Sequence, residues 1–484
     1  MGKTADYLGK TAAIIRNFLG QTSLHGFRFI AEEERHWSER WFWTMLCAVS
    51  WVGFGVMFQK SYTAFQENSI SFVVETTDLN LLTTLPSISI CEYDNEAHLS
   101  KKAKQIFGTR HDINLDEVLR ELTYFSGSAY YLKEVCNNGG IKCPRGNYSQ
   151  LVRSVRAKCE EFLVACTTLE SKFDCCKHFV PTETEVGPCF TFSAGNEKKL
   201  KDQGERDWID LVPDLRSKLP AIGVGLNGTA KVYLHSEHEV PYLNTLSSEV
   251  TLTEVHVFKD LMVSTIEIEN DPDLRELSIY QRKCRFPDEN NLELADFYSY
   301  SSCIVDCRRR AQMKLCNCTS HFMPKTKPEE HCNYEGIICL DKHINYLSEP
   351  TTNPRGKGGL VCDCLPACVD LDFNVVDIRM SDILLYPIPN IPESAVQVRL
   401  RDIPTEKYKR IVVRGKLDMV VSIGGAAGLF LGASLLTMVE LTNFLFGAGP
   451  SGQDDETNLT PNDEVRGSQN ENDPPAQGVL PFVL

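Results

Sequence analysis

The sequence DMVVSIGGAAGLFLGASLLTMVELTNFLF (418–446) contains 21 consecutive uncharged residues, Met419–Val439, followed by Glu440 and six more uncharged residues. A helix that crosses the hydrocarbon core of a bilayer needs about 20 such residues. A buried helix of a soluble domain, the alternative, rarely stays uncharged over this length. The segment therefore predicts a membrane-spanning helix at residues 418–446.

Small residues recur at regular spacing in this segment. Gly424, Gly428 and Gly432 lie at every fourth position, which would place them on one face of a helix, and Gly425 lies beside them. Small residues with this spacing let helices approach closely in lipid. We therefore expect Gly424, Gly425 and Gly428 to pack against neighbouring helices.

Three small residues, Gly432, Ala433 and Ser434, lie together shortly before Glu440. Small side chains allow the backbone to leave helical geometry, so that carbonyl and hydroxyl oxygens can face a water-filled path. Oxygen ligands suit a hard cation. A stripe used only for helix packing explains the glycines but not this cluster. From these residues a cation pore and a helix-packing segment are both open interpretations.

An acidic residue lies near each end of the segment. Glu440 follows Asp418 by 22 positions, or about 33 Å along a straight helix, which would place each acid near one membrane surface. In a symmetric oligomer, the copies of Glu440 would form an acidic ring that concentrates cations at the inner mouth. A solvated acid at a helix end is the alternative.

A second apolar segment, WFWTMLCAVSWVGFGVMF (41–58), lies near the N-terminus and has 18 uncharged residues. We expect a first membrane-spanning helix at residues 41–60. A cleaved signal peptide would begin with a short basic stretch and end at small residues. Residues 1–40 precede this segment and aromatic side chains fill it, so a retained span is favoured.

The chain has 19 cysteines, and all except Cys47 lie between Cys91 and Cys368. An even number of cysteines confined to one region indicates a disulfide framework formed in an oxidising compartment. Zinc is the alternative for the pairs Cys316/Cys318 and Cys362/Cys364. Their C-x-C spacing, without a histidine at ligand spacing, argues against it, and we expect no metal.

N-glycosylation sequons begin at Asn147, Asn227 and Asn317, inside the cysteine-rich region. Sequons and disulfides together place residues 61–417 outside the cell and both termini in the cytoplasm, as in a multi-pass plasma-membrane protein. Basic residues just before the second span oppose this orientation in a simple charge count. Long translocated domains follow that rule poorly, so the cysteines carry more weight.

The net charge is −15, which argues against nucleic acid as a partner. Residues 447–484 contain seven acids and one arginine. Such a polar segment cannot bury enough apolar surface to fold alone. We therefore expect a disordered, acidic cytoplasmic tail.

The cysteine-rich region carries patterns of both strands and helices, which predicts an α+β domain. In the helical pattern at 294–316, Cys303 and Cys307 are four residues apart and share one helix face. Two cysteines on one face can form two disulfides that link the helix to a neighbouring segment at two positions along its axis. The other patterns are strands at 231–236, 249–258 and 260–269 and a helix at 115–125.

These residues resemble those of a known family. GLFLGASLLTMVEL (428–441) is similar to the second-span signature of the degenerin/epithelial sodium channel family, the amiloride-sensitive sodium channels, which include the acid-sensing channels. SLHGFRFI (23–30) is similar to the motif that precedes the family's first span, and FDCCKHFVPTETEVGPCFTF (173–192) resembles the insect pickpocket branch. Further similar stretches are LPSISICEYDN (85–95), CRFPDE (284–289), YSYSSCIVDCRRRAQMKLCNCTSHFMP (298–324) and CDCLPAC (362–368).

The resemblance implies a homo- or heterotrimer with a hand-like extracellular domain, whose thumb-like region covers about residues 284–368. It implies passive, sodium-selective conduction with no cofactor, selectivity at Gly432, Ala433 and Ser434, and gating at His25 and Gly26. It also implies the disulfides Cys284–Cys368, Cys303–Cys364, Cys307–Cys362, Cys316–Cys339, Cys318–Cys332 and Cys91–Cys189, and Cys166 paired with Cys175 or Cys176. The partners of Cys136, Cys143 and Cys159 stay open.

Two outer-pore residues depart from the family pattern. Val421 replaces a small residue and Ser422 replaces a common aspartate, which leaves amiloride sensitivity open. A non-conducting accessory or receptor subunit is the main alternative. A purinergic-type receptor channel would lack the His25-Gly26 and Gly432-Ala433-Ser434 motifs. An enzyme is not expected, since His235 and His238 lack metalloprotease spacing and fit a strand that runs into a surface loop. The sequence reveals neither the stimulus nor any extracellular ligand.

Overall fold

The computed structural model describes residues 15–32, 34–76, 85–137, 143–169, 171–204, 209, 219–351, 358–383, 392–402 and 406–447. They belong to two compact units, one formed by Met1–Phe58 with Ile423–Leu484 and the other by Gln59–Ser422. We call these the helical unit and the disulfide-rich domain. The predicted disordered tail lies outside the described residues from residue 448 onward.

The helical unit contains two hydrophobic helical segments. α3 (Trp37–Glu67) is the one described helix that is long and apolar enough to cross a membrane by itself. α15 (Lys416–Leu431) and α16 (Leu435–Gly447) meet this criterion only when they are taken together as one broken helix. A short helix at 15–21 and α2 (Phe27–Ala31) precede α3.

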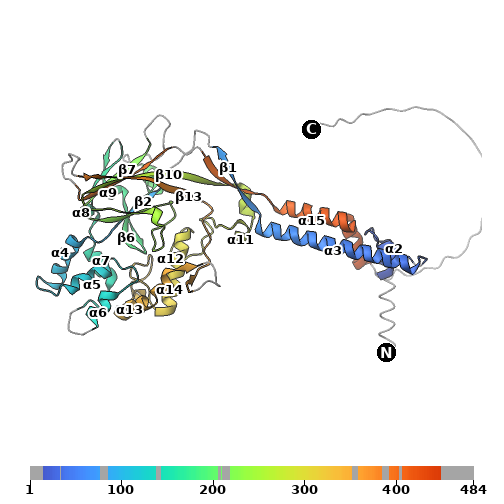
Figure 1. The fold of residues 1–484 in the computed structure, drawn as a ribbon, viewed down its shortest axis with the longest axis horizontal. Helices are drawn as coiled ribbons and strands as arrows, with labels where there is room; N and C mark the ends of the chain where they lie inside the picture. The colour runs from blue at the N-terminus through green and yellow to red at the C-terminus, as the bar shows by residue number, and fades with distance from the viewer. Residues whose placement is uncertain are drawn as a thin grey trace, which may run out of the picture. The chain divides into compact units, whose positions relative to one another are not determined.

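α3 extends beyond the predicted span of 41–60 at both ends. The helix begins at Trp37 and continues to Glu67, because the polar residues after Phe58 include good helix formers such as Lys60 and Gln66. α3 and α15 run side by side in Figure 1. They approach closely at Gly53, where an added Cβ would lie 2.7 Å from the ring of Phe430.

Two β-sheets form the centre of the disulfide-rich domain (Figure 1). The larger sheet has the order β1-β15-β10-β14-β7-β3-β4, and β13 also pairs with β10. The smaller sheet has the order β5-β6-β2-β8-β9. The bounds of the larger sheet's strands are β1 Ile70–Thr76, β3 Leu163–Thr167, β4 Lys172–Phe173, β7 Ala221–Leu226, β10 Val257–Asn270, β13 Leu371–Asp382, β14 Ser394–Leu400 and β15 Glu406–Val412. Those of the smaller sheet are β2 Ser87–Glu92, β5 Val180–Thr184, β6 Gly187–Phe192, β8 Ala230–His235 and β9 Val250–Leu252.

The strands next to the hydrophobic helices form one antiparallel ladder. β1 follows α3 in the chain and β15 precedes α15, and the two strands pair from Ile70 opposite Val412 to Thr76 opposite Glu406. β15 also runs parallel to the end of β10, where Ile268 lies opposite Tyr408. The two connections to the helical unit are therefore neighbours in a single sheet.

The main hydrophobic core lies between the two sheets and is lined by strands of both. Ile88 and Val232 come from the smaller sheet, and Leu261 and Val398 come from the larger one; all four are fully or almost fully buried. Along β10, buried residues alternate with partly exposed ones, which is typical of a sheet with one buried face, whereas every residue of β2 is buried.

A second hydrophobic core lies among the helices, which Figure 1 shows grouped on one side of the domain. It includes Val118, Leu132, Val152 and Ile337. The longer helices are α4 Glu96–Phe107, α5 Asn114–Thr123, α6 Tyr130–Cys136, α7 Tyr148–Val155, α10 Ala194–Asp202, α12 Tyr300–Cys316 and α13 Tyr334–Lys342. The shorter helices are α8 Cys159–Phe162, α9 Cys175–His178, α11 Ile279–Arg282 and α14 Ile344–Ser348.

Two predicted elements have different bounds in the structure. The helix predicted at 294–316 begins at Tyr300, because Ser299 caps it by accepting a hydrogen bond from the Ser302 N–H. The strand predicted at 249–258 is two strands, β9 and the start of β10. The chain turns between them, and His256 has a left-handed backbone conformation with φ +65° that ends an extended run.

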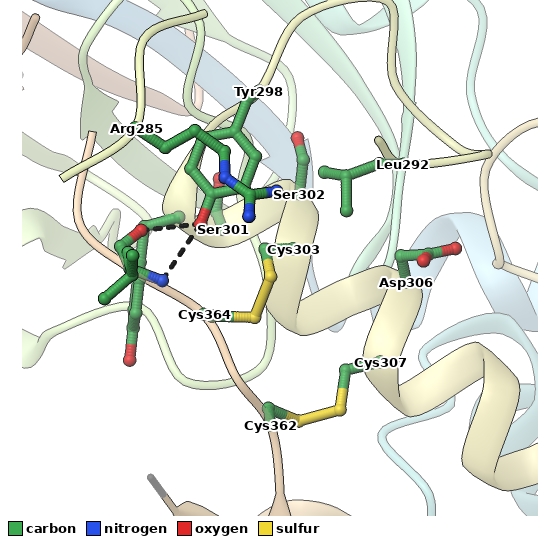
Figure 2. Close-up of a disulfide and its surroundings, with 12 residues drawn as sticks. Arg285, Leu292, Tyr298, Ser301, Ser302, Cys303, Asp306, Cys307, Cys362 and Cys364 are labelled. Atoms are coloured by element: carbon green, nitrogen blue, oxygen red, sulfur yellow. Dashed lines mark hydrogen bonds between the residues drawn. A yellow bond between two sulfur atoms is a disulfide. The ribbon is translucent and has the colours of Figure 1, made fainter. Parts of the chain in front are cut away.

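All 18 cysteines from Cys91 to Cys368 form disulfides, so the zinc alternative is wrong. Figure 2 shows Cys303 and Cys307 projecting from one face of α12 toward Cys364 and Cys362. The other pairs implied by the resemblance are also present: Cys91–Cys189, Cys284–Cys368, Cys316–Cys339 and Cys318–Cys332. The open pairings are Cys136–Cys143, Cys159–Cys176 and Cys166–Cys175.

Candidate ion pathway at the break in the second hydrophobic helix

The second hydrophobic helix is interrupted at Gly432, Ala433 and Ser434, and α15 and α16 meet there at a bend of 72°. Gly432 has φ +66°, a left-handed conformation that glycine adopts without steric cost. The expectation that small residues let the backbone leave the helix agrees with this break. The straight-helix distance predicted between Asp418 and Glu440 is wrong, because the helix bends between them.

Ser434 begins the helix after the break. Its hydroxyl oxygen accepts a hydrogen bond from the Thr437 N–H at 3.3 Å, while its own N–H donates to Thr437 Oγ1 at 3.2 Å. This reciprocal arrangement satisfies two backbone donors that a helix N-terminus would otherwise leave without partners. The side chain of Ser434 remains exposed in the single chain.

His25 occupies the space beside the break. A Cβ built on Gly432 would lie 2.5 Å from His25 Cδ2, so the imidazole lies directly against the glycine. The His25 N–H donates to the Leu431 carbonyl, at the end of α15, at 3.0 Å. A side chain at Gly432 would therefore displace His25. The structure brings together two residues that the resemblance assigns to gating and to selectivity.

Gly26 allows the segment before α3 to turn closely against that helix. Its φ is +85°, and an added Cβ would lie 2.6 Å from Cys47 Sγ. Cys47 is the one cysteine outside a disulfide, and its Sγ lies 3.7 Å from the His25 carbonyl oxygen. The backbone of the His25–Gly26 motif is thus held between α3 and α15.

Glu440 lies on α16 and contacts the same N-terminal segment. The Ser23 N–H and hydroxyl both donate to Glu440 Oε2, at 3.2 Å and 2.9 Å. Sequence reasoning did not single out Ser23 or Thr437. The signal was available, since Ser23 lies within the quoted motif and Thr437 lies three residues after Ser434.

Within the described part of the chain, the glycine stripe is not packed against another helix. A Cβ added to Gly424 or Gly425 would meet nothing within 4 Å, and one added to Gly428 would approach only the Ala433 carbonyl at 3.9 Å. Gly432 has left the helix and does not continue the stripe. The predicted packing role of these glycines would need a neighbouring subunit, whereas Gly53 provides the close approach inside the chain.

The N-terminal end of α15 is capped by the side chain of Asp418. Asp418 Oδ2 accepts a hydrogen bond from the Gly415 N–H at 2.9 Å, in the first turn of the helix. An acid at this position stabilises the helix N-terminus. Val421 and Ser422 are exposed in the single chain, and the structure leaves their outer-pore role a prediction.

The sequons differ in their surroundings. The side chains of Asn147, Asn227 and Asn317 are all exposed. Thr319 of the third sequon is fully buried, and its backbone N–H donates to the Glu330 carbonyl. Cys318, the middle residue of that sequon, is bonded to Cys332.

His235 is the last residue of β8, which agrees with the strand predicted at 231–236, and its side chain is buried. Its Nδ1 lies 2.8 Å from the Ser236 carbonyl oxygen and its Nε2 lies 2.8 Å from Ser89 Oγ. Burial lowers the pKa of His235 to about 4. The residue is an internally bonded, neutral core histidine.

One cavity of the disulfide-rich domain has the size of a small-molecule site. It has a volume of about 310 Å³ and lies among α5, α6 and β8. Aromatic side chains contribute strongly to its lining, including Tyr93, Tyr124, Tyr131 and Tyr233. Its size is at the lower end of the range for small-molecule sites, about 300–1,000 Å³.

The chain thus combines a disulfide-rich α+β domain with one helix long and apolar enough to cross a membrane and a second hydrophobic segment that is broken at small residues. A family model described as "Amiloride-sensitive sodium channel" matches residues 18–444. The chain belongs to the amiloride-sensitive sodium channel family. This is a family of plasma-membrane ion channels and not of enzymes, as predicted, and its members assemble as multimers of related subunits.

Relatives from insects and fish share low identity with this chain over most of its length. The sodium channel protein Nach of Drosophila ananassae is 23% identical, with 91% of this chain and 87% of the relative covered. Pickpocket protein 19 of Drosophila melanogaster is 22% identical, with coverages of 88% and 89%. Acid-sensing ion channel 4-B of Danio rerio is 23% identical, with coverages of 90% and 76%.

Proposed function

We propose that this chain is a subunit of a sodium-selective cation channel, opened by an extracellular stimulus and carrying passive sodium flux. Its two hydrophobic segments cannot enclose a pore alone, so several identical or related subunits must contribute. The family resemblance supports a trimer. The stripe of Gly424, Gly425 and Gly428, which is open in the single chain, would then be available to pack against a neighbouring subunit.

The observation that carries the proposal is the contact between the His25 imidazole and Gly432 at the helix break. The break ends the regular hydrogen bonding of the helix and gathers carbonyl and hydroxyl oxygens at one level of the hydrophobic segment. Such oxygens can replace part of the hydration shell of a hard cation. The contact with His25 links this level to the segment that precedes the first span, which supports a role in gating.

The proposed topology follows from the distribution of disulfides. Residues 61–417 would be extracellular, because disulfides persist in oxidising compartments. Residues 1–40 and 447–484 would be cytoplasmic, with spans at 41–60, extended here to α3, and at 418–446. Membrane insertion of the broken α15–α16 pair is part of the proposal.

Bulky replacement of Ser434 tests the proposal. We expect Ser434→Trp to alter the permeability ratio of sodium to potassium, or to abolish current, while surface labelling is retained. Val49→Phe, at an exposed position of α3, is the matched control and should conduct normally. Normal selectivity in Ser434→Trp would contradict a pore at the break. A chain that reaches the surface but conducts only with related subunits, and without sensitivity to Ser434, would be an accessory subunit.

A further inference from the structure

A line of side-chain oxygens connects the helix break to Glu440. Ser434 Oγ lies 3.3 Å from Thr437 Oγ1, and Thr437 Oγ1 lies 2.9 Å from Ser23 Oγ. The Ser23 hydroxyl then donates to Glu440 Oε2. The middle member, Thr437, is only 6% exposed, so the line is shielded at its centre. The segment before α3 thus supplies the group that joins two residues of the second hydrophobic helix.

Glu440 receives both of its recorded donors from Ser23. The N–H and the hydroxyl of Ser23 bond the same oxygen, Oε2, at 3.2 Å and 2.9 Å. Among the described residues, no basic side chain forms an ion pair with Glu440, and Oε1 has no hydrogen-bond partner. Two donors on one oxygen fix the rotation of the carboxylate and leave the other oxygen available.

We propose that Ser23 is a positioning residue for ion selectivity, which orients Glu440 so that its free oxygen faces permeating cations. This inference rests on the proposed channel function. The Ser23 hydroxyl can donate to the carboxylate while it accepts from Thr437, which in turn contacts Ser434. Ser23 therefore couples the orientation of the acid to the geometry of the break.

Two variants of Ser23 test the positioning role. Ser23→Ala removes the hydroxyl and leaves only the longer hydrogen bond from the backbone N–H to Glu440, whereas Ser23→Thr retains the hydroxyl. Since a hydrogen bond to a charged group shifts an equilibrium by roughly tenfold or more, we expect Ser23→Ala to change the sodium-to-potassium permeability ratio by about two- to tenfold. Ser23→Thr should restore the wild-type ratio. A merely structural role would lower the number of channels without moving the reversal potential.

A double-variant cycle identifies Glu440 as the group that Ser23 acts on. In a Glu440→Gln background, Ser23→Ala should produce no further change in the permeability ratio, because residues in one hydrogen-bond network are not additive. Additive effects of the two substitutions, or an unchanged reversal potential in Ser23→Ala, would overturn the inference. The proposed channel function would survive either result.

Cross-linking tests the contact without any current. In the full chain with Cys47→Ala, the pair Ser23→Cys and Thr437→Cys should form a disulfide under mild oxidation, detected by mass spectrometry of the digested protein. Phe18→Cys with Phe444→Cys is the positive control, since the centroids of these two rings lie 4.6 Å apart. Single-cysteine variants are the negative controls. A cross-link in the control pair alone would overturn the inference. Cross-linking in a chain that never conducts, alone or with related subunits, would overturn both the inference and the proposed function.

Discussion

The imidazole of His25 fills the position that a side chain on Gly432 would occupy, with 2.5 Å between His25 Cδ2 and an added Cβ. Two residues more than 400 positions apart in the sequence therefore depend on each other's shape. Replacing glycine here meets two obstacles, the contact with His25 and the left-handed φ of +66°.

Gly432→Ala should reduce current per surface channel by roughly tenfold, since a left-handed conformation costs a residue with a side chain about 1–2 kcal/mol and the methyl group would also displace His25. Current should be normalised to surface labelling. Gly55→Ala in α3, where the added Cβ also meets nothing within 4 Å, is the matched control. If His25→Ala did not lessen the effect of Gly432→Ala, the two residues would act independently.

The disulfides of the disulfide-rich domain should differ in their contribution to stability. Cys91 and Cys189 are 98 positions apart, whereas Cys136 and Cys143 are 7 apart. The loop-entropy model gives about 5 kcal/mol for the longer loop and about 2 kcal/mol for the shorter one. Replacing both cysteines of each pair by serine should lower the melting temperature more for Cys91–Cys189. Equal losses would mean that local packing, not loop closure, dominates.

A buried ion pair joins α12 to the turn between β5 and β6. Arg308 bonds Glu185, and their side chains are 1% and 2% exposed. Removing one partner of such a pair leaves a buried charge and costs about 3–5 kcal/mol, whereas replacing both partners by apolar groups is often close to neutral. Glu185→Met should therefore lower the melting temperature more than the double variant Glu185→Met/Arg308→Met. The reverse order would show that the bonds of Arg308 to Asn244 and Leu347 matter more.

Acidification should destabilise the disulfide-rich domain through His235. Its pKa is lowered to about 4 by burial, while an unfolded histidine titrates near 6.5. The unfolded state then binds more protons between these values, so stability falls as the pH drops from about 6.5 to about 4, by up to about 3 kcal/mol. The melting temperature of the full chain in detergent should decrease over this window. The decrease should be smaller in His235→Gln, and an identical pH profile would contradict this origin.

The three sequons should not be used equally. Asn147 is exposed, whereas Asn317 is followed by a disulfide-bonded Cys318 and by Thr319, which is fully buried. We expect Asn147→Gln to remove one glycan from the gel mobility of the protein and Asn317→Gln to remove none. Cys332→Ser, which keeps Cys318 from closing its disulfide, should increase modification at Asn317. Loss of a glycan in Asn317→Gln alone would show that transfer precedes disulfide closure.

Local patterns predicted the features that depend on neighbouring residues. The shared face of Cys303 and Cys307 predicted two disulfides from one helix. The small residues at Gly432–Ser434 predicted that the backbone leaves helical geometry there. The partners of Cys136, Cys143 and Cys159 stayed open, because pairing depends on which cysteines the folded chain brings together. The order of the strands in the sheets could not be predicted for the same reason. β10 lies between β14 and β15, which come more than 100 residues later in the chain.

The contacts of the candidate pathway illustrate the same limit. Gly432 was singled out by the cluster of small residues and His25 through the family resemblance, but no local pattern relates the two. Gly53 was overlooked although the motif Gly53-x-Gly55 lies inside the first apolar segment. Its role depends on Phe430 of the other hydrophobic segment, which the sequence alone could not place beside it.

The ladder of β1 and β15 has a mechanical consequence. The two strands are hydrogen bonded along their lengths, from Ile70 opposite Val412 to Thr76 opposite Glu406, and each continues within a few residues into a hydrophobic helix. Pulling on one strand loads the other, because the hydrogen bonds of an antiparallel pair run perpendicular to the strands and oppose their sliding. A load applied to β1, which follows α3 in the chain, would therefore be shared with β15, which precedes α15.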